Sequence, residues 1–337
     1  MLEHGLLSPE TVRSEVKLKE LDGLIERIKG HPALEAYYIV DEPKANSFAD
    51  LERMVAHLRE KDPKHLAFVN VLPIIPAIKG EGKDSAVGAY QDYLRSYLKI
   101  VKPDLLSYDY YHFFRTKDGK PFDDTNFFLN LSLIRDAALS EGIPFLNIIQ
   151  CSQFLDYWRM PNENELRWLV NTTLCYGGRG ISYFLYWGPE KYRGLYRDGK
   201  PIALLEQVSK INKEILDLSP ILMTLNSIGV YHSAPLPTGT EPIPTDFPVD
   251  LQSDHEFLVG LFSGSNRRTG IMIVNRNYTE AARVKVRSRA HNLQQYISAN
   301  RSWRAVKTLE GVFSFTLPPG GTTLFEYKSK PVGSTEE

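Results

Sequence analysis

The chain has 337 residues, with 40 basic and 41 acidic side chains and a net charge of -1 at pH 7. A chain of this length is longer than a domain with a single hydrophobic core usually is, and it therefore predicts two domains. The balanced charge gives no positive surface field for nucleic acid or an anionic membrane, so the sequence predicts neither as a partner.

The N-terminal stretch has neither a basic start followed by an apolar core nor a long apolar run. We therefore expect a soluble chain without a signal peptide, and the sequence leaves its localisation unknown. Ser8, with Pro9 and Glu10 after it, has the composition of a helix start. Apolar residues recur at helical spacing from there and predict a first helix that ends near Gly30.

An alternation of short apolar runs and amphipathic stretches follows. The apolar runs are rich in β-branched and aromatic residues and lie at 36–41, 66–72, 104–110, 144–150 and 180–187. The amphipathic stretches predict helices at about 47–60, 88–102, 124–141, 162–176 and 201–217. Nearly continuous apolar strands separated by helices are typical of parallel strands covered on both faces. The order predicts an α/β domain of five βα units over residues 1–220.

The pattern changes after residue 220 to short alternating strands, with Gly, Asn and Pro between them. This predicts an all-β sandwich domain over 221–330, with a long irregular loop at 233–252 and a disordered tail at 331–337. Cys151 and Cys175 have no metal-ligand or redox spacing and are expected to be buried free thiols. The sequence also lacks phosphate-loop, G-x-S-x-G and H-E-x-x-H motifs, so we predict no metal and no cofactor.

The stretch "YYIVDEP" at 37–43 is the first candidate for chemistry, because its apolar run stops at Asp41 and Glu42. Ionised acids are costly to desolvate, so a strand carries them only where it meets water or a partner charge. The alternative is that both acids favour the dipole of the next helix. Ser47, with Asp50 three residues later, is the better candidate for that helix cap.

This stretch, the strand ends "VNVLP", "SYDYYHFF" and "YFLYW", and the trailing β-sandwich together resemble clan A glycoside hydrolases. The resemblance covers nearly the whole chain and implies a TIM-type (β/α) barrel. It implies Glu42 as the acid/base, Asp41 in place of an Asn that binds a sugar hydroxyl, and Trp187 as the aromatic floor. Gln150 stands where the clan carries its nucleophilic Glu.

Only one helix precedes residue 36, so the sequence looks like a partial or truncated barrel that lacks the first three strands. Either the chain is a fragment of a longer barrel, or five units are stable alone or by association. Open sheet edges and exposed apolar faces favour self-association, so we expect a homo-oligomer.

The second carboxyl group that glycoside hydrolysis needs is expected at another strand end. Asp109 is the preferred candidate, although the sequence does not say whether its face of the strand is the inner one. Glu190, in the loop after the last strand, is the next candidate.

Aromatic faces suit the apolar side of a sugar ring, whereas its hydroxyl groups need polar partners. Tyr111, Trp158 and Trp187 are therefore expected as platforms, and Asn70 and Gln150 as hydroxyl-binding groups. The sequence predicts a glycoside hydrolase that cleaves O-glycosidic bonds of β-linked oligo- or polysaccharides by carboxylate acid/base catalysis. The alternative is a non-catalytic carbohydrate-binding or scaffolding protein derived from such a barrel.

Overall fold

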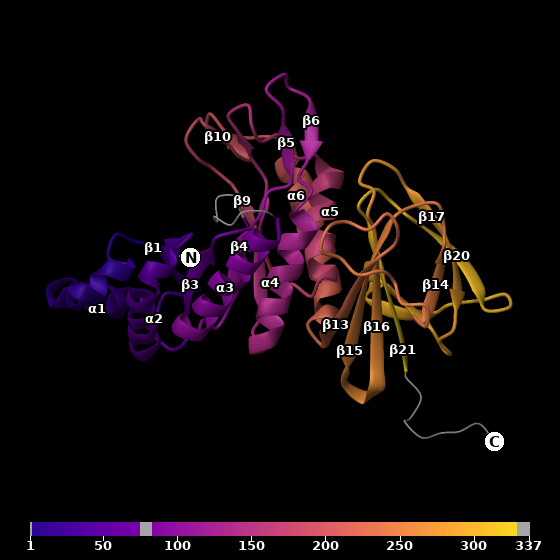
Figure 1. Ribbon diagram of the computed structural model, residues 1–337, viewed down its shortest axis with the longest axis horizontal. Helices are drawn as coiled ribbons and strands as arrows, with labels where there is room; N and C mark the ends of the chain where they lie inside the picture. Colours follow the sequence, from indigo (N-terminus) through magenta and orange to yellow (C-terminus); the bar gives the residue numbers. More distant parts are fainter. Residues whose placement is uncertain (1, 75–82, 329–337) are drawn as a thin grey trace. The chain divides into compact units, whose positions relative to one another are not determined.

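The computed structural model describes residues 2–74 and 83–328 (Figure 1). The chain divides into two compact units. One comprises Met1–Tyr110 and Leu133–Ile148, and the other comprises Tyr111–Ser132 and Ile149–Glu337. These units do not separate at residue 220, so the division into residues 1–220 and 221–330 stays a prediction. The tail expected at 331–337 lies outside the described residues.

The first unit contains a parallel sheet in the order β1-β2-β3-β4-β7. Its strands are β1 (Leu2–Glu3), β2 (Ala36–Asp41), β3 (Leu66–Val71), β4 (Leu106–Asp109) and β7 (Phe145–Gln150), the last of which leaves this unit after Ile148. The helices are α1 (Glu15–Ile28), α2 (Phe48–Lys61), α3 (Lys83–Val101) and the later part of α4 (Phe127–Glu141). These elements confirm the predicted alternation of strands and helices; the two-residue strand β1 was not expected.

The start of the chain differs from the prediction of one continuous helix. A 3-10 helix, Pro9–Arg13, comes first, and α1 begins six residues after Pro9 at Glu15. Ser8 makes no side-chain cap, whereas the Ser14 hydroxyl accepts a hydrogen bond from the N–H of Lys17. The break brings Arg13 against the buried carboxylate of Asp50 in α2, which compensates that charge.

The second unit holds the remaining helices and the last strand of the partial barrel. Within this unit β9 (Gly180–Phe184) follows the end of β7 in the strand order, and the N–H of Cys151 donates to the carbonyl of Phe184. The helices are α5 (Glu163–Cys175), α6 (Leu204–Leu222) and the first part of α4. The five predicted strands therefore form the partial-barrel sheet, but the last one ends at Phe184 and leaves Trp187 in the following loop.

Short hairpins extend from this part of the chain. Their strands are β5 (Phe113–Arg115) with β6 (Pro121–Asp123), β8 (Gln153–Phe154) with β10 (Tyr192–Arg193), and β11 (Tyr196–Arg197) with β12 (Lys200–Pro201). Both cysteines are buried free thiols, as expected. Among the described helices none has the length and apolar character that a membrane crossing requires.

The rest of the second unit is the expected antiparallel β-sandwich (Figure 1). One sheet has the order β13-β15-β16-β21-β18-β19 and the other β14-β17-β20. In β17 every second side chain is buried, so Val284 and Val286 join Val259, Ile271 and Ile273 in the core. The bounds are β13 (Leu225–His232), β14 (Val249–Gln252), β15 (Phe257–Gly264), β16 (Arg268–Asn275), β17 (Ala282–Ser288), β18 (Gln294–Ile297), β19 (Ser302–Ala305), β20 (Val312–Leu317) and β21 (Thr322–Lys328).

Strand β14 corrects the prediction that 233–252 is irregular throughout. Its four residues pair antiparallel with β17, and Val249 is buried in the sandwich core. A four-residue strand directly after a proline-rich run is too short to give a clear alternation signal. Tertiary pairing with β17 forms it instead.

Gly320, in the turn between β20 and β21, provides a test of how the sandwich is held to α5. Its φ is +61°, its carbonyl accepts a hydrogen bond of 2.9 Å from Asn171, and an added Cβ would lie 2.6 Å from the carbonyl oxygen of Asn164. We expect Gly320→Ala to lower the free energy of unfolding by roughly 1–3 kcal/mol in urea denaturation. Gly119→Ala is the matched control, because Gly119 also has a positive φ but no atom would meet its Cβ. Equal losses in the two variants would show that the close approach to α5 contributes nothing.

Candidate active site

Polar side chains gather where the parallel strands of the first unit end. Asp41 in β2 lies in register with Asn70 in β3, and Asn70 lies in register with Ser107 in β4. Side chains at alternate positions of a strand share a face, so Asp109 extends on the same side as Ser107. The structure thus places the Asp109 side chain on the same face of the sheet as the side chain of Asn70.

Asn70 joins these strands through its side chain, which is only 2 % exposed. Its Nδ2 donates hydrogen bonds of 3.0 Å to Asp41 and 2.7 Å to Asp109, and its Oδ1 accepts one of 3.1 Å from the Ser107 hydroxyl. The amide is therefore used within the protein, and the expectation that Asn70 binds a sugar hydroxyl stays a prediction. The carboxylates of Asp41 and Asp109 are therefore both within hydrogen-bond distance of one amide nitrogen.

Glu42 follows directly after β2 with a backbone φ of 49°, in the left-handed region that side chains other than glycine rarely adopt. Its N–H donates a 2.8 Å hydrogen bond to the carbonyl of Asn70, which extends the pairing of β2 with β3 by one residue. Backbone conformations of this kind cost energy and cluster at functional sites. Here the left-handed turn places a third acid beside Asp41 and Asp109.

The Glu42 carboxyl group reaches solvent but lies among enough protein atoms to be partly desolvated. Desolvation, followed by the charges of Asp109 and Asp41, raises the pKa of Glu42 from 4.5 to about 7. Burial and like charges both disfavour the ionised form. Glu42 can therefore hold a proton near neutral pH, as a general acid must.

Two tyrosines of α3 support the ends of β2 and β3, and the sequence reading missed them. The Tyr93 hydroxyl donates to the carbonyl of Pro43 at 2.9 Å, and the Tyr90 hydroxyl donates to the carbonyl of Leu72 at 2.8 Å. Burial, and to a lesser degree the charge of Glu42, raises the pKa of Tyr93, so this hydroxyl stays a donor. Their three-residue spacing on a helix, which places both on one face, was the available signal.

The predicted aromatic residues lie in the second unit, where two of them are in contact. The ring centroids of Tyr111 and Trp158 are 4.5 Å apart in an edge-to-face arrangement, and Tyr111 also stacks on Phe184 at 5.7 Å. Trp187 is 68 % exposed, and Glu190 in the same loop is exposed as well. Tyr111 and Trp158 thus form a packed cluster, whereas Trp187 presents its indole to solvent.

Gln150 is fully buried at the end of β7, and its side chain is committed to backbone groups of the second unit. Its Oε1 accepts hydrogen bonds from the N–H groups of His112 and Phe113, and its Nε2 donates to the carbonyls of Phe113 and Arg159. These hydrogen bonds give Gln150 a structural role. The expectation that Gln150 binds a sugar hydroxyl stays a prediction.

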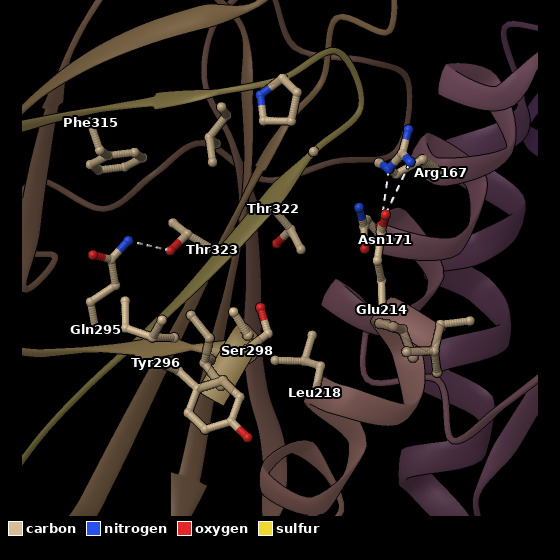
Figure 2. A pocket seen from close by; sticks show the side chains of 18 of the residues that line it. Arg167, Asn171, Glu214, Leu218, Gln295, Tyr296, Ser298, Phe315, Thr322 and Thr323 are labelled. Carbon is tan, nitrogen blue, oxygen red and sulfur yellow. Dashed lines mark hydrogen bonds and ion pairs between the residues drawn. The ribbon is translucent and has the colours of Figure 1, made fainter. Parts of the chain in front are cut away.

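A cavity of about 550 Å³ lies between α5, α6 and the sandwich, and none of the predicted site residues lines it. Among its polar groups, Arg167 contacts Glu214, and Gln295 donates to Thr323 at 3.0 Å (Figure 2). Asn171 is bonded to the Gly320 carbonyl. We interpret this cavity as part of the packing interface between the helices and the sandwich.

No cluster of three or more acidic, histidine or cysteine side chains suited to a metal ion occurs in residues 2–74 and 83–328.

Comparison with known proteins gives matches only among solved structures; no protein-family model and no curated protein match the chain. A GH30 endoxylanase from Clostridium papyrosolvens C71 has 13% identity and a TM-score of 0.44, over 94% of this chain and 72% of that one. An α-L-arabinofuranosidase from Thermotoga maritima has 12% identity and a TM-score of 0.44, over 91% and 69% of the two chains.

A β-galactosidase from the psychrophilic Marinomonas ef1 also has 12% identity and a TM-score of 0.44, and the match covers 63% of this chain but only 44% of that one. The sequence identity of all three matches is 13% or less. The partial (β/α) barrel and antiparallel β-sandwich described above form the architecture that the resemblance to clan A glycosidases implies.

Proposed function

We propose that the protein is a glycoside hydrolase in which Glu42 is the general acid/base and Asp109 is the second catalytic carboxylate. The observation that carries the proposal is the pKa of Glu42, raised to about 7 beside Asp109 and Asp41 at the ends of parallel strands. Glycoside hydrolysis uses one carboxyl group that is protonated at working pH and a second that is ionised. The carboxyl ends of barrel strands are where such groups act.

The proposed reaction starts with proton transfer from Glu42 to the glycosidic oxygen as the bond from that oxygen to the anomeric carbon breaks. Asp109 either attacks the anomeric carbon or deprotonates the water that does so. If Asp109 forms a covalent bond, Glu42 then takes the proton of the incoming water and is ready for the next cycle. Product stereochemistry separates these two routes.

The proposed substrates are β-linked oligo- or polysaccharides. Asp41 is exposed beside Glu42 and is a candidate acceptor for a sugar hydroxyl, in keeping with its place in the clan pattern. Trp187, Tyr111 and Trp158 remain candidate surfaces for sugar rings, with Trp187 favoured by its exposure.

The experiment that tests the proposal is an assay of the purified chain with nitrophenyl glycosides and with β-glucan and mannan oligosaccharides. Turnover that depends on Glu42 supports the hydrolase. The second candidate, a non-catalytic carbohydrate-binding protein, is favoured by Gln150, a structural amide at the strand end where the clan carries its nucleophile. Calorimetric binding of the oligosaccharides without turnover would support that candidate.

Self-association is a further part of the proposal, because a sheet that does not close into a barrel keeps edge strands with hydrogen-bonding groups available for another chain. We expect a dimer or larger assembly in light scattering at micromolar concentration. A monomer under these conditions would contradict the expectation without bearing on Glu42.

A further inference from the structure

We propose that Asn70 is a positioning residue that keeps Asp109 and Asp41 as carboxylates at fixed places and thereby reserves the proton of the site for Glu42. This inference rests on the proposed function for its catalytic meaning, although the arrangement itself can be tested without turnover. Asn70 acts through its neighbours and is not assigned a contact with substrate.

Asn70 contacts each of the three acids. Its Nδ2 donates to Asp109 at 2.7 Å and to Asp41 at 3.0 Å, and its backbone carbonyl accepts the N–H of Glu42 at 2.8 Å. An amide nitrogen has two N–H donors and no acceptor, so it satisfies only an acceptor oxygen. Both donors are used here, one on each carboxylate. Hydrogen bonds to an ionised carboxyl group favour the ionised form.

Ser107 fixes the direction of this amide. Its hydroxyl donates to Asn70 Oδ1 at 3.1 Å, and both side chains are buried, at 0 % and 2 % exposure. If the amide rotated by half a turn, its oxygen would face two carboxylate oxygens and its nitrogen would face the serine. Acceptor groups would then repel one another in a buried place, so the observed orientation is strongly favoured.

The hydrogen bonds from Asn70 determine which acid holds the proton. Three acids this close cannot all be ionised without repulsion, and such groups share protons unless their surroundings differ. Asp109 and Asp41 each receive an N–H donor from Asn70, whereas none of the described residues donates a hydrogen bond to the Glu42 carboxyl group. The proton is therefore retained on Glu42, and Asp109 stays available as a base or nucleophile.

The experiment follows the carboxyl carbons of the intact chain by ¹³C NMR during a pH titration, with Glu42→Gln and Asp109→Asn used to assign the two signals. In the parent protein we expect the Glu42 signal to titrate near neutral pH and the Asp109 signal to titrate at a lower pH than Glu42. In Asn70→Asp, which keeps the volume but replaces the donors, the Asp109 signal should titrate at a higher pH than in the parent. Ser107→Ala should shift it in the same direction by less.

If the protein turns over a glycoside, the acidic limb of its pH–rate profile should move up in Asn70→Asp, lowering kcat/KM at pH 5 by about tenfold for each pH unit of the move. An Asp109 signal that titrates identically in the parent, Asn70→Asp and Ser107→Ala proteins would overturn the proposed role of Asn70. Asn70→Ala separates packing from hydrogen bonding: a change seen with alanine but not with aspartate would also overturn it. Absence of turnover in the parent would reject the hydrolase while leaving the titration decisive.

Discussion

Replacing Glu42 by glutamine is expected to lower kcat by roughly 10²–10⁴-fold on a substrate with a poor leaving group, the range that a general acid contributes. Glutamine keeps the shape of the side chain and its left-handed backbone but has no proton to give at neutral pH. Substrates with an acidic leaving group, such as dinitrophenyl glycosides, need little proton assistance. The loss should therefore be much smaller for them at the bond-breaking step.

Glu35→Gln is the matched control for this substitution, since Glu35 is exposed just before β2, at the opposite end of the same strand from Glu42. It makes the same chemical change without touching the acids at the strand ends, and its activity should equal that of the parent. A Glu42→Gln protein as active as the Glu35→Gln protein on poor leaving groups would remove Glu42 from the mechanism.

Glu42→Gln is also expected to change how the stability of the protein depends on pH, an effect that can be measured without activity. The pKa of Glu42 is about 7 in the folded protein and 4.5 in its ordinary state, so between these values the folded chain binds more protons than the unfolded chain. Stability then falls as pH rises through this window. Glu42→Gln lacks this loss, and its melting temperature relative to the parent should therefore be higher at pH 8 than at pH 4.

The elements of the partial barrel could be predicted because each local signal agrees with the fold. The β2 run was expected at 36–41 and lies at Ala36–Asp41, because its apolar residues end abruptly at charged ones. The start of α1 could not be predicted in the same way. Ser8 and Ser14 are both typical caps, and in the structure the second one is used, with Arg13 paired to Asp50 of α2.

The site could be predicted in part. Asp41, Glu42 and Asp109 were selected from their positions at strand ends and their roles stay proposals, whereas the face of Asp109 was not predicted. Leu106, Ser107 and Tyr108 are all fully buried, so both faces of β4 are covered and hydrophobicity does not distinguish them.

The role of buried amides was also beyond the sequence. An Asn or Gln at a strand end can bind a ligand or satisfy its neighbours, and the choice depends on groups distant in the chain. For Gln150 these are the backbone at 112–113 and at 159, and for Asn70 they are the carboxylates of two other strands.

Asp109→Asn is expected to lower kcat by roughly 10³-fold or more, the scale seen when a group that acts with its partners as one catalytic unit is removed. Asparagine cannot attack the anomeric carbon or deprotonate water. Added azide, a small anion that can take the place of the missing carboxylate, should restore part of the turnover if Asp109 is a nucleophile. Glu190→Gln is the control, because Glu190 is exposed in the loop after β9 and is the rival for this role.

The same variant tests the electrostatic origin of the acid. Asp109 is the larger of the two charge contributions that raise the pKa of Glu42, so its neutralisation should bring that pKa down from about 7 toward the ordinary 4.5. Desolvation, the largest contribution, remains, and the value should stay above 4.5. NMR titration of the Glu42 carboxyl carbon measures this directly. If Glu190→Gln abolishes turnover while Asp109→Asn leaves both turnover and the Glu42 titration unchanged, the second carboxylate is Glu190 and the pairing of Glu42 with Asp109 is wrong.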